Sequence, residues 1–328
     1  MKTTKCFGLI LFIVLLLTAF SCFGKDTSLV NPFTTQGNWY KANLHAHTTL
    51  SDGDSNLPDV VNKYRKLGYS VLAVTDHEKS NDVSGYSDAD FILLNGMETH
   101  PKCNTSETKY HLVCLNLPSG FVMPTELAAQ QRIDRVKEAG GEVIFAHPYW
   151  SGHKFNEIAP LKGLIGIEVY NNLCDQMIGK GYGSVHWDDL LQSKRYIPAV
   201  ATDDLHKINT PVGGWVMVKS ENLTPEAVMA AIKTGCFYSS AGPIIEDFRI
   251  ENDTVYLRCS PVKEVRLLGN SSRGKKYRAS GSDLLTHIEQ KVPADSYLRY
   301  FRAEIVDAND RCAWTNPIII EPPKEKKK

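Results

Sequence analysis

The sequence has no excess charge of either sign, since 37 lysines and arginines balance 37 aspartates and glutamates. Stable nucleic-acid binding depends on a basic surface, so we expect no stable nucleic-acid partner. No apolar run beyond residue 20 approaches the length of a membrane span. Internal repeats, long low-complexity tracts and Cys-x-x-Cys pairs are also missing. These absences argue against a membrane-spanning body, a repeat array and a zinc site built on paired cysteines.

Cysteine is scarce, with eight residues at positions 6, 22, 103, 114, 174, 236, 259 and 312. In an exported chain the last six could pair as disulfides, and six cysteines allow fifteen connectivities. A chain of this length also has core enough without cross-links, so buried free thiols fit equally well. Both alternatives stay open on the sequence alone.

The first 21 residues have the pattern of an export signal. Lys2 and Lys5 precede the uncharged apolar stretch 7–20, which is short for a membrane span. We therefore predict a signal peptide over residues 1–21 and a periplasmic or membrane-anchored protein. Ser21-Cys22 resembles a loose lipidation site, so the expected membrane contact is a lipid on Cys22, with ordinary signal cleavage as the alternative. Residues 22–37 would be a flexible leader and residues 324–328 a basic tail.

Residues 38–243 alternate between short apolar runs and helical patterns. Apolar runs over residues 70–75, 142–146, 164–170 and 197–201 predict buried strands. Pro58 and Gly68 bracket one amphipathic helix, and Thr125 is the expected N-cap of a second that extends to residue 139. Further helices are expected over residues 185–194 and from Thr224 onward. This alternation predicts an α/β barrel.

The pattern changes at Gly242-Pro243. Beyond it, residues 245–250, 254–259, 264–268, 287–292 and 297–306 form short apolar runs between turn signals. Turn-forming residues at 270–274 and 308–310 predict hairpins. We therefore predict a small antiparallel β-sandwich over residues 244–323, with Trp314 in its core.

Nine His, Asp and Glu residues recur in short motifs along the first part of the chain, and six of the ten histidines are among them. The motifs are His45-Ala46-His47, Ser51-Asp52-Gly53, Thr75-Asp76-His77, Gly96-Met97-Glu98, Tyr110-His111-Leu112, Ala146-His147-Pro148 and Asp204-Leu205-His206. In an extended strand His45 and His47 point to the same side and can hold one ion. His77 and His147 follow apolar strands, so a barrel mouth would gather them. Imidazoles with harder carboxylates suit zinc, manganese or iron.

This motif order resembles the PHP (polymerase and histidinol phosphatase) family of metal-dependent phosphoesterases. The resemblance implies a distorted (β/α)7 barrel with two to three divalent ions at the carboxyl ends of its strands. It assigns His45, His47, Glu98 and Asp204 to a first metal, Glu98, His111 and His147 to a second, and Asp52, His77 and His206 to a third. Glu98 would then bridge two ions. Asp52 stands where some family members have a histidine, so the identity and filling of the third site stay open.

Other polar residues close to these motifs are expected to assist. Asp76, adjacent to His77, is predicted to orient a ligand imidazole and not to be a ligand itself. Lys207 is the chosen candidate to meet a substrate phosphate, with Lys79 and Lys102 as further candidates. The four remaining histidines are expected not to be metal ligands: His100, which could line the site, and His153, His186 and His287.

The resemblance implies hydrolysis at phosphorus by a metal-held hydroxide, without a covalent enzyme intermediate. We therefore predict an exported phosphoesterase whose partner is a small phosphorylated substrate, either a phosphomonoester or a phosphodiester. A metal-dependent hydrolase of C–N or C–O bonds is the alternative enzyme, because the same chemistry attacks carbonyl centres. A non-catalytic protein that binds glycan through the β-sandwich is the third hypothesis.

Overall fold

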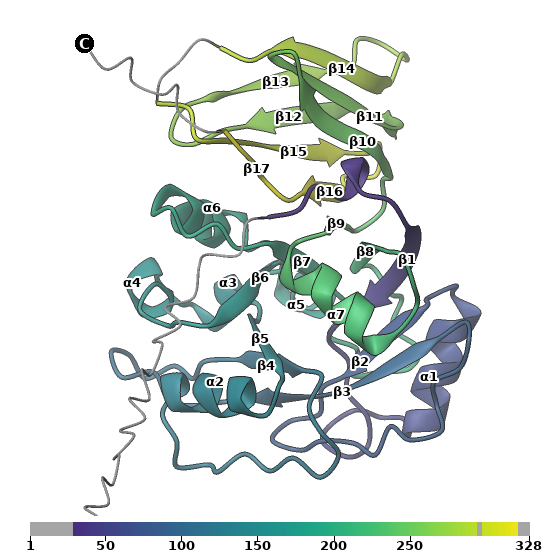
Figure 1. Cartoon of the computed structure of the whole chain (residues 1–328), viewed down its shortest axis with the longest axis vertical. Coiled ribbons are helices and arrows are strands. Elements are labelled where there is room, and N and C mark those ends of the chain that lie inside the picture. The colour runs from purple at the N-terminus through teal and green to yellow at the C-terminus, as the bar shows by residue number, and fades with distance from the viewer. Residues whose placement is uncertain (1–28, 294–296, 321–328) are drawn as a thin grey trace, which may run out of the picture.

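A computed structural model describes residues 29–293 and 297–320 of the chain. The predicted signal peptide, the lipidation site Cys22, residues 22–28 of the leader and the basic tail lie outside the described residues. Figure 1 shows two stacked parts, with strands β10 to β17 in the upper part and strands β1 to β7 with most of the helices in the lower part. Among the described residues, no helix is long and apolar enough to cross a membrane.

The lower part is built on seven strands that pair in sequence order. They are β1 (Asn38–Asn43), β2 (Val71–Val74), β3 (Ile92–Thr99), β4 (Leu112–Leu115), β5 (Glu142–Phe145), β6 (Leu164–Asn171) and β7 (Ala199–Thr202). All neighbours are parallel except β4, which runs antiparallel to β3 and β5. A parallel bridge from Ala46 to Leu205 brings the chain after β1 next to the chain after β7. The strands therefore form a large, mainly parallel sheet that curves into a barrel-like arrangement.

Helices cover the outside of these strands (Figure 1). They are α1 (Leu57–Lys66), α2 (Ala129–Glu138), α3 (Pro148–Ser151), α4 (Phe155–Ile158), α5 (Asn172–Ile178), α6 (Ser184–Gln192) and α7 (Pro225–Lys233), and a short 3-10 helix, η1 (Pro32–Thr34), precedes β1. The prediction of α1 is confirmed: Asn56 caps it through the backbone amide of Asp59, and Val60, Val61 and Tyr64 are buried.

Helix α2 begins later than predicted. Thr125 was the expected N-cap, but the observed N-cap is Ala128, whose backbone amide donates to the side chain of Gln131. The carbonyl of Thr125 instead accepts a hydrogen bond from the guanidinium of Arg132, 2.5 Å away. The side chain of Arg132 therefore holds residues 125–127 in a turn through the carbonyls of Thr125 and Leu127, and the helix starts beyond it.

The upper part contains β10 (Ile245–Glu251), β11 (Thr254–Val262), β12 (Glu264–Leu268), β13 (Gly274–Arg278), β14 (Leu285–Lys291), β15 (Tyr300–Val306), β16 (Cys312–Thr315) and β17 (Ile318–Ile319). Strands β10, β11 and β14 form one antiparallel sheet, and β13, β12, β15 and β16 form another layer. Phe248, Leu257, Val265 and Ile305 belong to the apolar core shared by the two layers. The sequence did not indicate β13, because Gly-Lys-Lys-Tyr-Arg is an exposed edge strand without apolar alternation.

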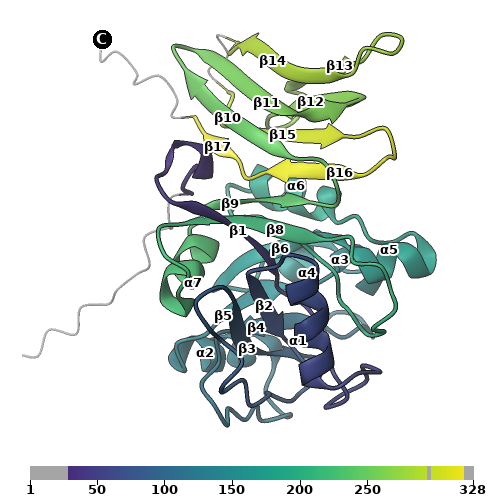
Figure 2. The same ribbon diagram turned by 90° about the vertical axis from the view of Figure 1, so that its right-hand side faces the viewer.

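One sheet runs through both parts of the molecule, as Figure 2 shows. Strands β8 (Trp215–Ser220) and β9 (Phe237–Ser240) extend the sheet from β1, and β9 pairs with β16 across the predicted boundary at Gly242-Pro243. Trp314 is buried, as predicted, but its ring packs against Tyr170 and Tyr182 of the lower part, with ring centroids 5.9 and 6.1 Å apart. The two parts therefore share hydrogen bonds and apolar core.

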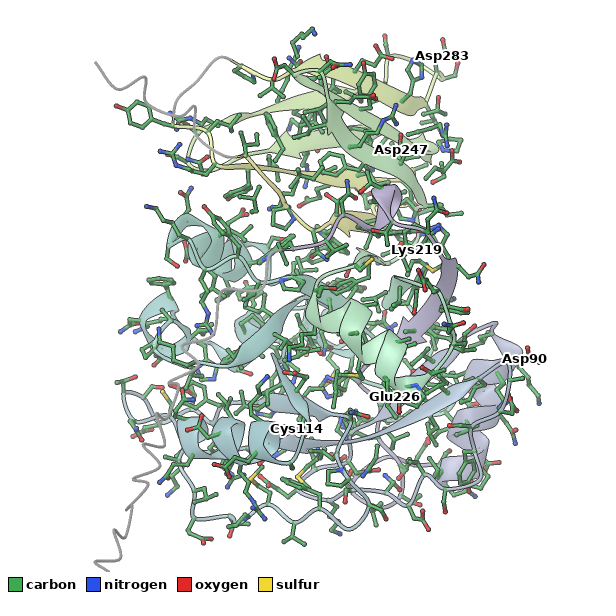
Figure 3. The ribbon with its side chains drawn as sticks, viewed as in Figure 1. Asp90, Cys114, Lys219, Glu226, Asp247 and Asp283 are labelled. Carbon is green, nitrogen blue, oxygen red and sulfur yellow. The ribbon has the colours of Figure 1, made fainter. Side chains whose placement is uncertain are left out.

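The six cysteines of the described residues are all free and buried. Of the two alternatives that the sequence left open, the structure supports buried thiols. Cys114, labelled in Figure 3, shows the usual environment, in the interior of β4. Burial raises the pKa of its thiol well above the ordinary value.

Candidate metal centre

All nine predicted metal ligands lie at one edge of the barrel-like sheet. His45 and His47 follow β1, His77 follows β2, Glu98 is near the end of β3, His147 follows β5, and Asp204 and His206 follow β7. His111 precedes β4, but β4 is antiparallel, so the start of this strand meets the ends of its neighbours. Asp52 reaches the same edge from the loop after β1. The strand topology thus gathers residues that are up to 161 positions apart in the sequence.

Glu98 is the centre of this group. Its side chain is almost fully buried and faces imidazoles on all sides. Its Oε1 lies 2.8 Å from His111 Nδ1 and 3.3 Å from His147 Nε2, and its Oε2 lies 2.9 Å from His77 Nδ1, 3.4 Å from His45 Nε2 and 3.6 Å from His47 Nε2. Burial opposes ionisation, but the surrounding imidazoles hold the pKa of Glu98 well below its usual range. Both carboxylate oxygens are therefore available as anionic ligands toward different sides.

Asp204 is the second buried carboxylate of the centre. Its Oδ1 lies 3.3 Å from His45 Nε2 and 3.1 Å from His47 Nε2. Burial opposes its ionisation as well, yet the neighbouring imidazoles hold its pKa below the usual range. Asp204 has a φ of 54° and His147 a φ of 22°, values that non-glycine residues rarely adopt. Such backbone strain typically occurs where the surrounding structure forces a side chain into a functional position.

A more exposed group adjoins these two carboxylates. Asp52 Oδ2 lies 3.2 Å from His77 Nε2, and Asp52 Oδ1 lies 3.3 Å from His206 Nε2. The ring of His47 lies 4.4 Å from that of His77 and 4.1 Å from that of His206, between centroids. His47 therefore joins the exposed group to the buried one.

The donor set fits divalent metal ions. Nitrogen and oxygen ligands bound to one ion at about 2.0–2.1 Å with tetrahedral angles lie roughly 3.3 Å apart. The four distances that link His45 and His47 to Glu98 and Asp204 range from 3.1 to 3.6 Å. Several of these buried atoms also have no hydrogen-bond partner: His45 Nε2, both ring nitrogens of His47, His77 Nδ1 and Asp204 Oδ1. An unpartnered buried polar atom costs about 1–3 kcal/mol, and a cation would remove that cost.

Glu168 on β6 contacts the ring nitrogen of His45 that faces away from Glu98 and Asp204, and it was not among the predicted site residues. One oxygen accepts hydrogen bonds from His45 Nδ1 and the Thr202 hydroxyl, both at 2.8 Å. The other oxygen accepts from the backbone amide of His147 at 2.8 Å. This contact leaves His45 Nε2 free to face Glu98 and Asp204, as for a metal-binding histidine oriented by a carboxylate. A single acid inside the apolar run 164–170 was the available signal, because a buried carboxylate needs partners.

Asp76 is fully buried beneath the loop that carries Asp52. Its carboxylate accepts hydrogen bonds from the backbone amides of Thr48 and Ser51 at 2.8 and 3.1 Å, and from their hydroxyls at 2.8 and 2.6 Å. Asn81 Nδ2 donates to it as well. These partners orient the loop over residues 48–51, whereas a ligand imidazole was the expected partner. Asp76 therefore acts on the centre through the position of Asp52.

The remaining predicted residues lie around the rim. Lys207 is exposed, next to His206. The exposed Lys79 donates through Nζ to the Leu50 carbonyl. His100 lines the site as expected, with its ring centroid 4.5 Å from His77 and 4.4 Å from His111. Burial works against its charged form, but the neighbouring carboxylates of Glu78 and Glu98 raise the pKa of His100 to about 9.

An aromatic side chain borders the opposite side of the centre. Trp150 of α3 packs edge-on against the rings of His111 and His147, with centroids 5.6 and 5.1 Å apart. About 37% of its surface is exposed, so the indole forms part of the site wall that a substrate can reach. The sequence motif His147-Pro148 placed this residue near the site, but did not indicate that its ring would face the ligands.

Two glycines of the motifs are required by close packing. A Cβ on Gly96 would lie 2.6 Å from the Cys114 carbonyl oxygen, so only glycine lets β3 pass β4 two residues before Glu98. A Cβ on Gly53 would lie 2.8 Å from the backbone of His47. The glycines in Gly-x-Glu and Ser-Asp-Gly thus serve the placement of the neighbouring ligands.

No protein-family model matches the sequence, and no curated protein matches it. Solved structures do match the fold. A two-domain protein from Bacteroides vulgatus that contains a predicted PHP-like metal-dependent phosphoesterase aligns with a TM-score of 0.50 and 13% identity, over 90% of this chain and 99% of that one. A candidate metal-dependent phosphoesterase from Bifidobacterium adolescentis aligns at 0.42 and 18%, over 59% and 96% of the two chains. An amidohydrolase from Chromobacterium violaceum aligns at 0.39 and 16%, over 51% and 87%.

The fold inference rests on the first of these structures, which spans both parts of this chain. The likeness agrees with the PHP resemblance that the order of the sequence motifs indicates. This chain therefore shares the fold of a two-domain protein that contains a predicted PHP-like metal-dependent phosphoesterase.

Proposed function

We propose that this protein is a PHP-family hydrolase of phosphate esters that depends on divalent metal ions. One observation carries the proposal: buried imidazoles and carboxylates at a single sheet edge leave ligand atoms without hydrogen-bond partners. A folded protein keeps such atoms at a cost of about 1–3 kcal/mol each, which a bound cation would offset. We interpret the lower part as a distorted (β/α)7 barrel and the upper part as a β-sandwich domain.

The side chains divide into ligands and supports. Glu98 would bridge two ions, because its two oxygens face different imidazoles. His45 and His47, with Asp204, would hold one ion, and His111 and His147 would hold its neighbour. Bound ions of this kind activate water as a nucleophile and take up charge on a phosphate oxygen. Glu168 holds the ring of His45 in one orientation, so that the ligand geometry is set before substrate binds.

A third ion would occupy the exposed group of Asp52, His77 and His206. Its position at the rim suits contact with a phosphate oxygen of the substrate. Asp52 is about half exposed, with 52% of its side-chain surface accessible. We therefore expect this site to bind more weakly than the two buried sites, because water competes for an exposed ligand set. The metals proposed are zinc, manganese or iron.

The proposed substrate is a small phosphomonoester or phosphodiester. Lys207 at the rim supplies positive charge for phosphate, and the exposed face of Trp150 offers an apolar surface for the group attached to it. We also propose export of the protein, with a lipid on Cys22 as its membrane anchor. Export would suit the release of phosphate from compounds outside the cytoplasm.

Metal-reconstituted protein tests the reaction class directly. Chelator-stripped protein is loaded separately with zinc, manganese or iron, and assayed against phosphomonoesters, phosphodiesters, carboxylic esters and amides. We expect hydrolysis of phosphate esters only in loaded protein, and none in Glu98→Gln loaded in the same way. His287→Gln is the matched control, because this histidine lies on β14 far from the centre.

The assay also separates the alternatives. Hydrolysis of esters or amides without phosphate-ester hydrolysis would favour the C–N or C–O hydrolase. Full metal loading with no turnover, together with glycan binding, would favour the non-catalytic protein. Metal analysis of wild type and Asp52→Ala measures the number of ions: a loss of one ion per chain in Asp52→Ala supports three sites, and equal content supports two.

A further inference from the structure

A second cluster of metal-ligand side chains lies outside the proposed catalytic centre. Cys103 belongs to the loop between β3 and His111, His153 lies two residues before α4, and Glu157 lies within α4. All three are buried, and Cys103 Sγ, a ring nitrogen of His153 and a carboxylate oxygen of Glu157 lie within 4.8 Å of one another. Nothing in the proposed phosphoesterase mechanism uses them.

The hydrogen bonds of His153 show which ring nitrogen faces the cluster. Its Nε2 lies 3.0 Å from the Lys109 carbonyl oxygen, which can only accept, so Nε2 carries the proton. In the neutral ring Nδ1 then has a lone pair, and this lone pair faces Glu157 Oε2 at 3.3 Å. Two acceptors facing each other repel. A backbone carbonyl that fixes the second ring nitrogen is the usual support of a metal-binding histidine.

A protonated, hydrogen-bonded His153 explains the geometry less well. A charged N–H to carboxylate hydrogen bond normally closes to about 2.7–2.9 Å. The observed 3.3 Å is the separation of a nitrogen and an oxygen that share one tetrahedral zinc ion, about 3.3 Å for bonds of about 2.0–2.1 Å. Cys103 Sγ lies 3.6 Å from the other carboxylate oxygen, Glu157 Oε1, so the carboxylate lies between the thiol and the imidazole and would present both oxygens to a shared ion.

The surroundings of Cys103 favour a thiolate ligand. Burial alone would raise the pKa of its thiol, but hydrogen bonds with Ser106 and Thr105 lower it. The Thr105 hydroxyl lies 3.4 Å from Sγ and 3.2 Å from Glu157 Oε1. A further oxygen atom is therefore close to both of these ligand candidates. Cys114 differs in this respect, since burial dominates there and its pKa is raised.

We propose that Cys103, His153 and Glu157 form a structural site for a zinc-like divalent ion, separate from the catalytic centre. Binding deprotonates the Cys103 thiol and releases that proton to solvent. The ion ties the loop over residues 101–109 to α4. Tyr110, which follows this loop, immediately precedes the ligand His111, and its ring stacks on His153 with centroids 4.8 Å apart. The site therefore braces the wall of the metal centre that carries His111 and Trp150.

Cobalt(II) distinguishes this site from the catalytic one, because only this site contains a thiolate. Full-length protein is stripped with chelator and loaded with cobalt(II). We expect a near-ultraviolet thiolate-to-cobalt charge-transfer band in wild type. Cys103→Ser should lose the band and one cobalt per chain, whereas Cys114→Ser should keep both. Hydrolytic activity is not read out, so the proposed function and this site can fail independently.

Wild-type protein alone can overturn the proposal, even if the substituted proteins do not fold. Fully cobalt-loaded wild type without the charge-transfer band would show that no thiolate binds the metal. A band that persists in Cys103→Ser would place the thiolate elsewhere. His153→Ala is the second variant: it keeps the thiol, and an unchanged band and cobalt content there would also contradict the assignment.

Discussion

Buried acidic side chains occur in both parts of the molecule, but their partners differ. In the upper part Glu264 and Glu304 pair with the guanidinium of Arg266, and Arg302 bonds Asp188 at 2.7 Å. In the metal centre Glu98 and Asp204 face imidazoles at distances that are mostly too long for good hydrogen bonds. His45, His47, His77, His100 and Asp204 supply six of the nine buried side-chain atoms without a hydrogen-bond partner in the described residues.

This difference separates polar side chains that stabilise the fold from polar side chains that form the candidate metal site. Arginine pairs with a carboxylate through several directed hydrogen bonds, so the ion pair is complete without a ligand. In the metal centre several imidazole and carboxylate atoms are buried without hydrogen-bond partners, and His147 and Asp204 have strained backbone with positive φ. The polar contacts of these groups are therefore incomplete. Bound cations between them would complete these contacts. Buried polar groups that lack hydrogen-bond partners therefore indicate the candidate metal site, whereas fully paired ion pairs belong to the structural support around it.

Separating the two parts gives the largest expected effect. A chain that ends at Ala241 lacks β16, which pairs with β9, and Trp314, which fills the core beside Tyr170. We expect this fragment to be insoluble or unfolded, and the full chain to unfold in a single transition. Solubility, near-ultraviolet circular dichroism and thermal unfolding check this. A soluble fragment that binds metal would instead establish Gly242-Pro243 as the boundary of an independent domain.

Substitution in the metal centre is the next largest effect. Glu98→Ala should abolish most metal binding and lower activity by roughly 10³-fold or more, because this carboxylate serves two ions. His77→Ala should cost less, because it serves one. His287→Ala in the upper part should leave both unchanged. Elemental analysis and kcat/KM measure these differences, and equal metal content in wild type and Glu98→Ala would reject the bridging role.

Arg302 tests whether the upper part depends on complete ion pairs. Its side chain is fully buried, lies over the Trp187 ring at 4.5 Å and bonds Asp188 of α6. Arg302→Ala should lower the free energy of unfolding by roughly 0.5–3 kcal/mol, because the Trp187 ring loses its packed partner and Glu304, which keeps Arg266, loses one of its two guanidinium contacts. Metal content should stay the same. Chemical denaturation measures the free energy of unfolding. A loss of metal at unchanged stability would contradict the distinction between paired structural groups and the unpaired groups of the metal site.

Trp150 tests the rim of the centre. Removing the indole takes away an apolar contact without removing a ligand, so Trp150→Ala should raise KM by roughly two- to tenfold. The value of kcat and the metal content should change little. Trp150→Phe is the control that keeps an aromatic ring. If kcat falls instead of KM rising, the indole acts by holding His111 and His147 in place.

The smallest expected effect is a pH dependence of stability near the centre. Burial opposes the ionisation of Glu78, but hydrogen bonds with His100, Thr99 and Arg132 lower its pKa from 4.5 to about 2. A depressed folded-state pKa contributes stability that is fully present above about pH 4.5 and is lost as the pH falls toward 2. Glu78→Gln should reduce this acid sensitivity. Unfolding free energies measured between these pH values check the sign.

The sequence anticipated features that depend on local pattern. The helix α1, the strands β2, β5, β6 and β7, and the turn between β12 and β13 follow from apolar periodicity and turn residues. Features that depend on distant contacts were missed or misplaced. Asp76 bonds Thr48 and Ser51, which lie 28 and 25 positions away, instead of a ligand imidazole. The start of α2 was misplaced for a more local reason, because Arg132 holds the carbonyls of Thr125 and Leu127.

By itself, the sequence determined which residue types were present as ligands and in what order, because His-x-His, Gly-x-Glu and Asp-x-His are local patterns of chemistry and spacing. Only the tertiary structure decided what each ligand meets. Because β4 runs antiparallel to β3, His111 at the start of β4 lies beside Glu98 near the end of β3. The long strand β6 places Glu168 next to Nδ1 of His45. These contacts depend on strand order and direction, which set distances between residues far apart in the chain and are not encoded at any one position.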